Sequence, residues 1–251
     1  MKVKRRIFSG CVCEQIIFNM SERTKNIKTA EPQIRFKTEE EREQHRLKQS
    51  KRHHARVVNA TFNPQSLYST LTLDNDNEVH TFDEARRLRD NYIRRLKYAV
   101  PNAQIMVYMG RGKKTDRIHF HMLSNGIDEE MIKSKWGMGE VVRIDNLKAR
   151  NFYKGVDCGQ DYTGLADYLF EHWKAEQGGH RWKQTSNVVQ PERETPTAVK
   201  RTYSERKPPK PPKGYKLVLT ERFEDYQSKE YGYLYFRYVK IPCDIKPPKR
   251  C

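Results

Sequence analysis

Long hydrophobic runs are missing from this 251-residue sequence, in which 36% of the residues are hydrophobic. No stretch of about 18 apolar residues occurs, which excludes a membrane-spanning helix, and we expect no membrane partner. The basic start, residues 1–6, is followed by an apolar stretch that Glu14 and Gln15 interrupt. We therefore expect no secretion signal.

Cysteine is scarce as well, because five residues, an odd number, lie scattered along the chain. This usage argues against a disulfide framework and favours a reducing compartment, so we expect a cytoplasmic location. The sequence also lacks a phosphate-binding loop of the type Gly-x-x-x-x-Gly-Lys-Ser/Thr, which excludes a helicase motor of that class.

Acidic residues are the minority: 32 Asp and Glu face 49 Lys and Arg, which gives a formal charge of +17. Residues 1–56 carry 15 basic and 7 acidic side chains, and residues 191–251 carry 15 and 8. Residues 57–190, between them, are nearly neutral, with 19 basic and 17 acidic side chains. Two basic segments around a neutral centre predict binding to a polyanion, and nucleic acid is the first candidate.

Composition and pattern divide the chain into four parts. Residues 1–56 are interpreted as a weakly folded basic arm with a helix over 38–56, which Thr38 can cap. Residues 57–190 hold the regular pattern of a folded domain. Residues 191–213, with six prolines and seven basic side chains, are interpreted as a linker. Residues 214–251 are predicted to be a β-rich basic extension.

The central pattern predicts an α+β domain: a central antiparallel sheet with helices packed mainly on one face. Alternating apolar residues indicate strands, and apolar residues at helical spacing after Thr81 or Asp83 indicate a helix to about residue 100. Two further helices are expected over 128–136 and 163–175. The expected strands cover 67–73, 105–109, 117–123, 140–144, 215–219 and 231–239.

The sharpest local motif is His119-Phe120-His121 within an expected strand. Side chains at i and i+2 of a strand point to one face, and the side chain at i+1 points to the other. Two imidazoles can therefore serve one metal ion while Phe120 anchors the strand. The alternative without a function is a pair of partly exposed histidines that bind no metal. Downstream, Tyr168 lies beside the apolar stripe of the last expected helix, where it can lean toward the histidines or be a buried aromatic.

These segments resemble the rolling-circle replication initiators of the HUH endonuclease superfamily. The strand motif of that family looks like residues 69–74, the histidine–hydrophobic–histidine motif matches residues 117–123, and the tyrosine helix is similar to residues 164–174. Residues 178–187 are similar to the closing segment of phage-type initiators. The resemblance covers about residues 57–190.

The resemblance implies that Tyr168 attacks a phosphate of single-stranded origin DNA, leaving a 5′-phosphotyrosine link and a free 3′-hydroxyl. His119 and His121 would hold Mg²⁺ or Mn²⁺. It also implies an origin hairpin as substrate, a host helicase and polymerase as partners, and the cytoplasm of a bacterial host cell as location. Tyr162 is the alternative nucleophile. A conjugative relaxase and a non-catalytic DNA-binding module remain alternative functions.

The chain departs from the family pattern at two places. Met109 stands where many members carry a glutamate ligand, and Glu171 and His172 stand where a lysine often follows the nucleophile. The candidates for a third metal ligand are Asp74, Asp116, Glu171 and His172.

Two groups of residues are candidates for DNA contacts. The first is the glycine-containing loop after residue 109, whose cations can reach phosphates. The second is a basic–aromatic pair that can clamp an unpaired base. The candidate residues are Arg111, Lys113, Lys114, Arg181 and Trp182.

Overall fold

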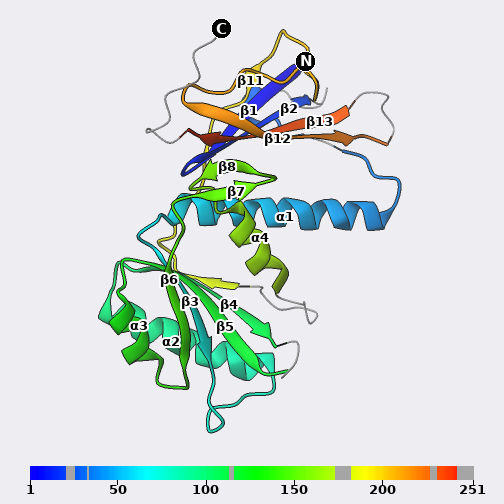
Figure 1. Ribbon diagram of the computed structural model, residues 1–251. Helices are drawn as coiled ribbons and strands as arrows, with labels where there is room; N and C mark the ends of the chain where they lie inside the picture. Colours follow the sequence, from blue (N-terminus) through cyan, green and yellow to red (C-terminus); the bar gives the residue numbers. More distant parts are fainter. Residues whose placement is uncertain (21–25, 33, 113–115, 173–181, 227–230, 242–251) are drawn as a thin grey trace. The chain divides into compact units, whose positions relative to one another are not determined.

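A computed structural model describes residues 1–20, 26–32, 34–112, 116–172, 182–226 and 231–241 (Figure 1). The chain divides into two compact units. Unit 1 combines Met1–Ala60, Arg150–Asp161 and Gln190–Cys251, and unit 2 combines Thr61–Ala149 and Tyr162–Val189. The two basic ends of the chain therefore belong to one unit. Among the described residues, no helix has both the length and the hydrophobicity needed to cross a bilayer.

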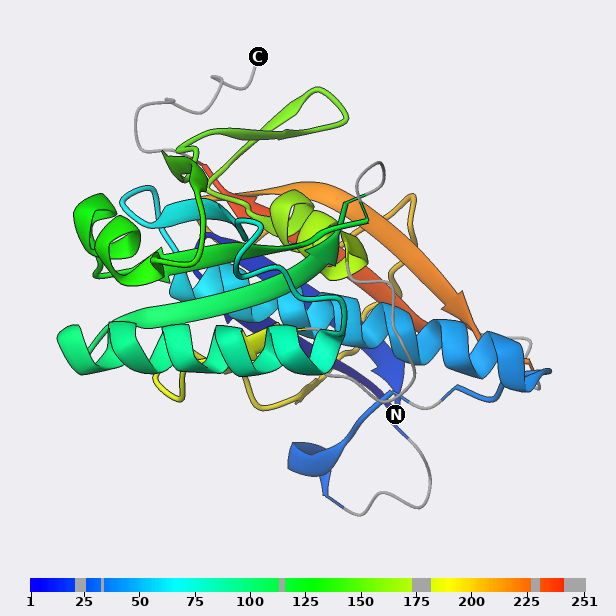
Figure 2. The same cartoon turned by 90° about the horizontal axis from the view of Figure 1, so that it is seen from below.

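Unit 2 is built on a five-stranded sheet of order β6-β3-β5-β4-β9, in which every neighbouring pair is antiparallel. Helices α2 and α3 pack on one face, and α4 lies on the other, as Figures 1 and 2 show. The elements are β3 (Leu67–Thr72), α2 (Phe82–Ala99), β4 (Gln104–Arg111), β5 (Ile118–Asn125), α3 (Glu129–Trp136), β6 (Val141–Asn146), α4 (Thr163–His172) and β9 (Trp182–Gln184).

Local sequence explains the helices of unit 2. Thr81 caps α2 in a capping box with Glu84, so each residue satisfies a backbone N–H at the start of the helix. Asp128 accepts a hydrogen bond from the Met131 N–H and caps α3. The apolar stripes of both helices cover the sheet and bury a core that includes Trp136. This face of the sheet holds the main core of unit 2.

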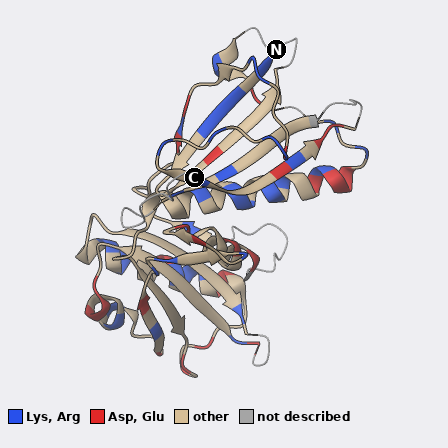
Figure 3. Cartoon of the chain, turned by 45° about the horizontal axis from the view of Figure 1, so that its top comes forward, with Lys and Arg blue, Asp and Glu red and all other residues tan. Residues whose placement is uncertain are grey.

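Unit 1 is built on a second antiparallel sheet of order β10-β1-β2-β13-β12, and β11 also pairs with β1. Helix α1 covers one face, and a small hairpin, β7-β8, belongs to the same unit. Figure 3 shows basic segments on β1 and along α1. The elements are β1 (Lys2–Ser9), β2 (Val12–Asn19), a 3-10 turn (Ile27–Thr29), α1 (Glu39–Thr61), β7 (Asn151–Tyr153), β8 (Val156–Gly159), β10 (Glu192–Arg193), β11 (Thr197–Ala198), β12 (Tyr215–Glu224) and β13 (Tyr231–Lys240).

A buried ionic network joins α1 to the sheet of unit 1. The Arg56 guanidinium on α1 donates to the Glu14 carboxylate on β2, and both side chains are almost fully buried. The Tyr235 hydroxyl donates a second hydrogen bond to Glu14 over 2.8 Å. The Arg52 guanidinium lies 3.7 Å from the centroid of the Tyr235 ring. A helix with few apolar residues is thus held through cations that meet buried acidic and aromatic partners.

The α+β class and the antiparallel pairing are confirmed, and the helix over 38–56 is observed as α1. The expectation of one central sheet is incomplete, because the described residues form a second large sheet in unit 1. Within unit 2, two of the three helices, α2 and α3, pack on one face of the sheet, and α4 covers the other.

The two predicted basic segments also differ from expectation. Residues 1–56 contribute two paired strands and α1 rather than a loose arm, and β10 and β11 lie inside the predicted linker. The predicted C-terminal hairpin forms as β12 and β13, but β13 pairs with β2. The predicted domain 57–190 covers all of unit 2, and its residues 57–60, 150–161 and 190 belong to unit 1.

Neutralising Glu14 is expected to destabilise unit 1. Glu14→Gln keeps an oxygen for the Tyr235 hydroxyl but leaves the buried Arg56 guanidinium without its counter-charge. Breaking a buried ion pair costs about 3–5 kcal/mol, so urea unfolding followed by circular dichroism should show a loss of this order. The matched control is Glu43→Gln, whose partner Arg46 is exposed, with an expected change within about 0.5 kcal/mol. Equal losses in the two variants would contradict the network.

Candidate active site

Strand β5 places His119 and His121 on one face of the sheet of unit 2. Phe120 points to the opposite face, where it is fully buried and its ring lies 5.5 Å from that of Trp136. The two imidazole centroids are 5.0 Å apart, and their planes are inclined by 81°. The predicted same-face arrangement is therefore present, with the apolar residue between the histidines acting as the anchor.

The neighbouring strand β3 supplies two hydroxyl groups to His121. Thr70 pairs with His121 across the sheet, and its Oγ1 lies 3.2 Å from the Nδ1 of His121. The Tyr68 hydroxyl lies 2.8 Å from the same nitrogen, and the Tyr68 ring stacks on the imidazole at 5.6 Å. These contacts fix the orientation of the imidazole. Metal-binding histidines commonly have their second ring nitrogen hydrogen-bonded in this way.

Helix α4 brings Tyr168 to the same face. The ring centroids of Tyr168 and His121 are 6.0 Å apart, and 48% of Tyr168 is exposed to solvent. Buried residues of the helix hold it in place, and the Phe170 ring lies 6.0 Å from the ring of Trp182 on β9. Tyr168 is therefore a phenol beside the histidine pair that an outside molecule can reach.

Burial sets the protonation of the groups around the site. It lowers the pKa of the His119 imidazole, and a hydrogen bond with the backbone of Arg117 partly opposes that shift. The neutral imidazole that results at neutral pH is the form that binds cations. Burial also raises the pKa of the Tyr68 phenol, against the effect of its hydrogen bond with Thr70. The neighbouring Tyr168 raises the pKa of Tyr68 further.

The structure brings no third metal ligand to the histidine pair among the residues it describes. Within them, no group of three His, Cys, Asp or Glu side chains is placed to hold one metal ion. Asp74 accepts hydrogen bonds from Asn77 in a turn after β3, and Asp116 pairs with Arg111. Glu171 is an exposed residue of α4. The side chain of His172, the fourth candidate, lies outside the described residues.

Tyr162, the alternative nucleophile, directly precedes α4. Its side chain is 2% exposed and its hydroxyl is buried. A phosphate cannot reach a phenol that is enclosed in this way. The structure therefore favours Tyr168 over Tyr162 as the accessible phenol.

Of the five residues predicted to contact DNA, the structure describes Arg111 and Trp182. Arg111 ends β4 on the face opposite to the histidines, where its guanidinium lies 5.1 Å from the Phe82 ring and donates to the His80 carbonyl. The expectation of a loop cation is wrong for Arg111, because the strand extends two residues beyond the predicted end at residue 109. Trp182 is half-buried on β9, paired with Tyr108. Lys113, Lys114 and Arg181 lie outside the described residues.

Sequence reasoning missed Tyr68 and Thr70 as parts of the site. Both belong to the strand singled out for its Ser-Thr-Leu-Thr run, and both lie on its histidine-facing side. The alternation of polar and apolar residues over 67–72 was a visible signal. It could not show that this strand lies beside β5, because the pairing joins residues more than 45 positions apart in the chain.

Comparison of the chain with protein-family models, with curated proteins and with solved structures gives no match.

Replacing the anchor is expected to cost stability, whereas replacing the partly exposed His119 is not. Phe120→Ala removes a fully buried ring, and such truncations cost about 3–5 kcal/mol. His119→Ala removes a partly exposed side chain and should change the free energy of unfolding by less than about 1 kcal/mol. Urea titration of both variants measures the difference. A larger loss in His119→Ala would mean that the imidazole is a core residue rather than a functional one.

Proposed function

We propose that the protein is a site-specific nuclease of the HUH type that nicks single-stranded DNA through Tyr168. The observation that carries this proposal is the position of a solvent-accessible phenol 6.0 Å from the imidazole of His121, ring centroid to ring centroid. The second imidazole, His119, lies on the same face of the sheet. A nucleophile next to a pair of cation ligands is the arrangement that phosphoryl transfer to tyrosine requires.

His119 and His121 would hold the Mg²⁺ or Mn²⁺ ion that this activity implies. Two observations support this proposal: the two rings share one face, and burial lowers the pKa of His119, which favours the neutral, cation-binding imidazole. Imidazole ligands suit Mn²⁺ better than Mg²⁺. When bound, the ion polarises the scissile phosphate and stabilises the charge that develops on it. Tyr68 and Thr70 are positioning residues, because they hold the ring of His121 in place through its Nδ1.

In the proposed step, the Tyr168 oxygen forms a bond to the phosphorus of a DNA phosphodiester and loses its proton to solvent. The bond from phosphorus to the 3′-oxygen of the preceding nucleotide breaks, and that oxygen takes up a proton. The products are a 5′-phosphotyrosine and a free 3′-hydroxyl. The new phosphodiester keeps the energy of the broken one, so attack by a 3′-hydroxyl can rejoin strands without ATP.

The biological role that we propose is initiation of rolling-circle replication in the cytoplasm of a bacterial host cell. A free 3′-hydroxyl can prime synthesis by a host polymerase, while a host helicase unwinds the duplex. The formal charge of +17 supports single-stranded origin DNA as the substrate, since cations on the protein gain affinity by releasing counterions from DNA.

Tyr168→Phe is expected to abolish formation of a covalent protein–DNA adduct. The test incubates the chain with a labelled pool of single-stranded oligonucleotides and Mn²⁺ and resolves adducts on denaturing gels. The matched control is Tyr98→Phe, because Tyr98 is a 91% exposed tyrosine on α2 of the same unit. The control should form the adduct at the wild-type rate. An adduct that persists in Tyr168→Phe would reject this nucleophile, and failure of wild type to cleave any sequence would favour a non-catalytic DNA-binding module.

Removing the imidazole of His121 is expected to slow adduct formation at least about 100-fold, because metal stabilisation of the transition state is worth several kcal/mol. His80→Ala is the control, since His80 is an exposed histidine before α2. Binding is read independently by NMR: Mn²⁺ should broaden the imidazole signals of His119 and His121 and leave that of His80 sharp. Uniform broadening of all three signals would contradict a site at the histidine pair.

A further inference from the structure

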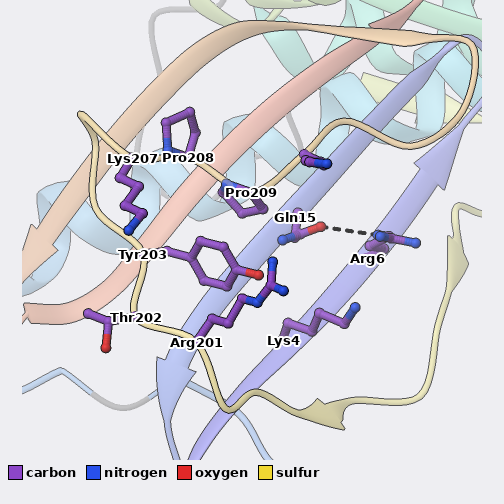
Figure 4. A pocket seen from close by; sticks show the side chains of 10 residues that line it. Lys4, Arg6, Gln15, Arg201, Thr202, Tyr203, Lys207, Pro208 and Pro209 are labelled. Carbon is purple, nitrogen blue, oxygen red and sulfur yellow. Dashed lines mark hydrogen bonds between the residues drawn. The ribbon is translucent and has the colours of Figure 1, made fainter.

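Unit 1 contains a cavity of about 690 Å³ on the face of its sheet opposite to α1. Its floor is formed by β1 and β2, and its other wall is formed by residues 201–210, named here the strap (Figure 4). The cavity lies within the size range of sites for small organic ligands. The lining residues are Lys4, Arg6, Gln15, Arg201, Thr202, Tyr203, Lys207, Pro208, Pro209 and Lys210.

The lining is strongly basic. Five of its ten residues are Lys or Arg, and none is Asp or Glu. Lys4 and Arg6 lie two positions apart on β1 and therefore share one face of the sheet. Glu194, which does not line the cavity, has its carboxylate 4.0 Å from the Arg6 guanidinium. The cavity thus favours an anion with several negative groups.

Hydrogen bonds and packing fix the walls of the cavity. The Arg6 guanidinium donates to the side-chain oxygen of buried Gln15 over 3.1 Å. The Tyr238 hydroxyl donates to the carbonyl of Pro209, which is itself buried. Ser204 and Lys207 exchange backbone hydrogen bonds of 3.1 Å, which close a turn within the strap. The basic groups are therefore carried on a shaped backbone rather than on a loose tail.

Tyr203 gives the cavity an aromatic wall. Its half-buried ring packs against an apolar cluster of the sheet that includes Cys13 and Phe236, and it also lines the cavity. Figure 4 shows this ring and the Arg201 side chain extending from the strap over the strands. An aromatic ring and an arginine beside a basic hollow are the groups that hold an unpaired base and its phosphates.

We propose that this cavity binds an unpaired nucleotide of a single-stranded nucleic acid, with its base on Tyr203 and its phosphates on the surrounding cations. A duplex keeps its bases paired and stacked, so it cannot place one in such a hollow. The proposal goes beyond the nicking activity, because the cavity belongs to unit 1 and uses none of the residues around Tyr168. It assigns a function to the strap, which the sequence suggested was only a linker.

Charge-matched double variants test the proposal in the full chain. Arg201→Gln with Lys207→Gln removes two cations that line the cavity, and Lys200→Gln with Arg206→Gln removes two neighbouring cations that do not line it. Binding of a fluorescent dT oligonucleotide is followed by anisotropy in EDTA over a series of salt concentrations. Two lost phosphate contacts should reduce the slope of log K against log salt by about 1.4 in the first variant. The second variant should keep the wild-type slope.

The aromatic wall is tested by a second pair of variants. Tyr203→Leu keeps an apolar side chain against the cluster but removes base stacking, and we expect binding at least about fivefold weaker. Tyr203→Phe keeps the ring and should bind as wild type does. If Tyr203→Leu fails to fold, as a thermal melt would show, the charge-matched pair still decides the question.

Three outcomes would overturn the proposal: equal effects of the two charge-matched variants, equal effects of the two Tyr203 variants, or duplex bound as tightly as single strands. Competition by dTMP distinguishes a site for free nucleotides from one for a polynucleotide. A failure of the proposed nicking function can be told apart from a failure of this proposal. In that case the Tyr168 adduct is absent, but oligonucleotide binding in EDTA still depends on Arg201 and Lys207.

Discussion

The two-residue side-chain period of β5 is the constraint on which the candidate site depends. It sends Phe120 into the core against Trp136 and leaves His119 and His121 together on the opposite face. The antiparallel register with β3 then places Thr70 opposite His121 and brings the Tyr68 hydroxyl to the same imidazole. A shift of one residue in that register would turn the site to the core side. The burial of Phe120 and its neighbours therefore holds the site in register.

The two faces of the unit 2 sheet differ in role: one holds an apolar core, and the other holds the candidate site. Helices α2 and α3 cover one face with a continuous apolar core, which specifies the order and register of the strands. Helix α4 covers the other face less completely, and Tyr168 there remains 48% exposed. Because the first face carries a continuous apolar core, polar side chains can gather on the second without leaving that core incomplete. This division explains how imidazoles and phenols are held close together in a unit with an ordinary hydrophobic core.

The elements of unit 2, except the short strand β9, could be predicted because their patterns are local. Alternation marks β3 and β5, and Thr81 and Asp128 mark the starts of helices through hydrogen bonds within three residues. The strands within residues 1–20 could not be predicted, because their polar residues have partners that are distant in the sequence. Glu14 interrupts an apolar stretch and looks like the end of one, yet its charge is matched by Arg56 on α1. Likewise, the face on which Arg111 lies depends on how far β4 extends.

The same period of two that carries the histidines also organises the basic start of the chain. As a cluster of charges, Lys2, Lys4 and Arg6 suggest a loose arm. In the structure they occupy one face of β1, and Val3 and Ile7 are buried on the other face. A strand held by hydrogen bonds on both sides fixes the direction of every second side chain. The imidazoles of β5 and the cations of β1 are thus placed by sheet backbone rather than by loops. Each set can present its groups at a fixed spacing without spending ligand-binding energy on ordering a flexible segment.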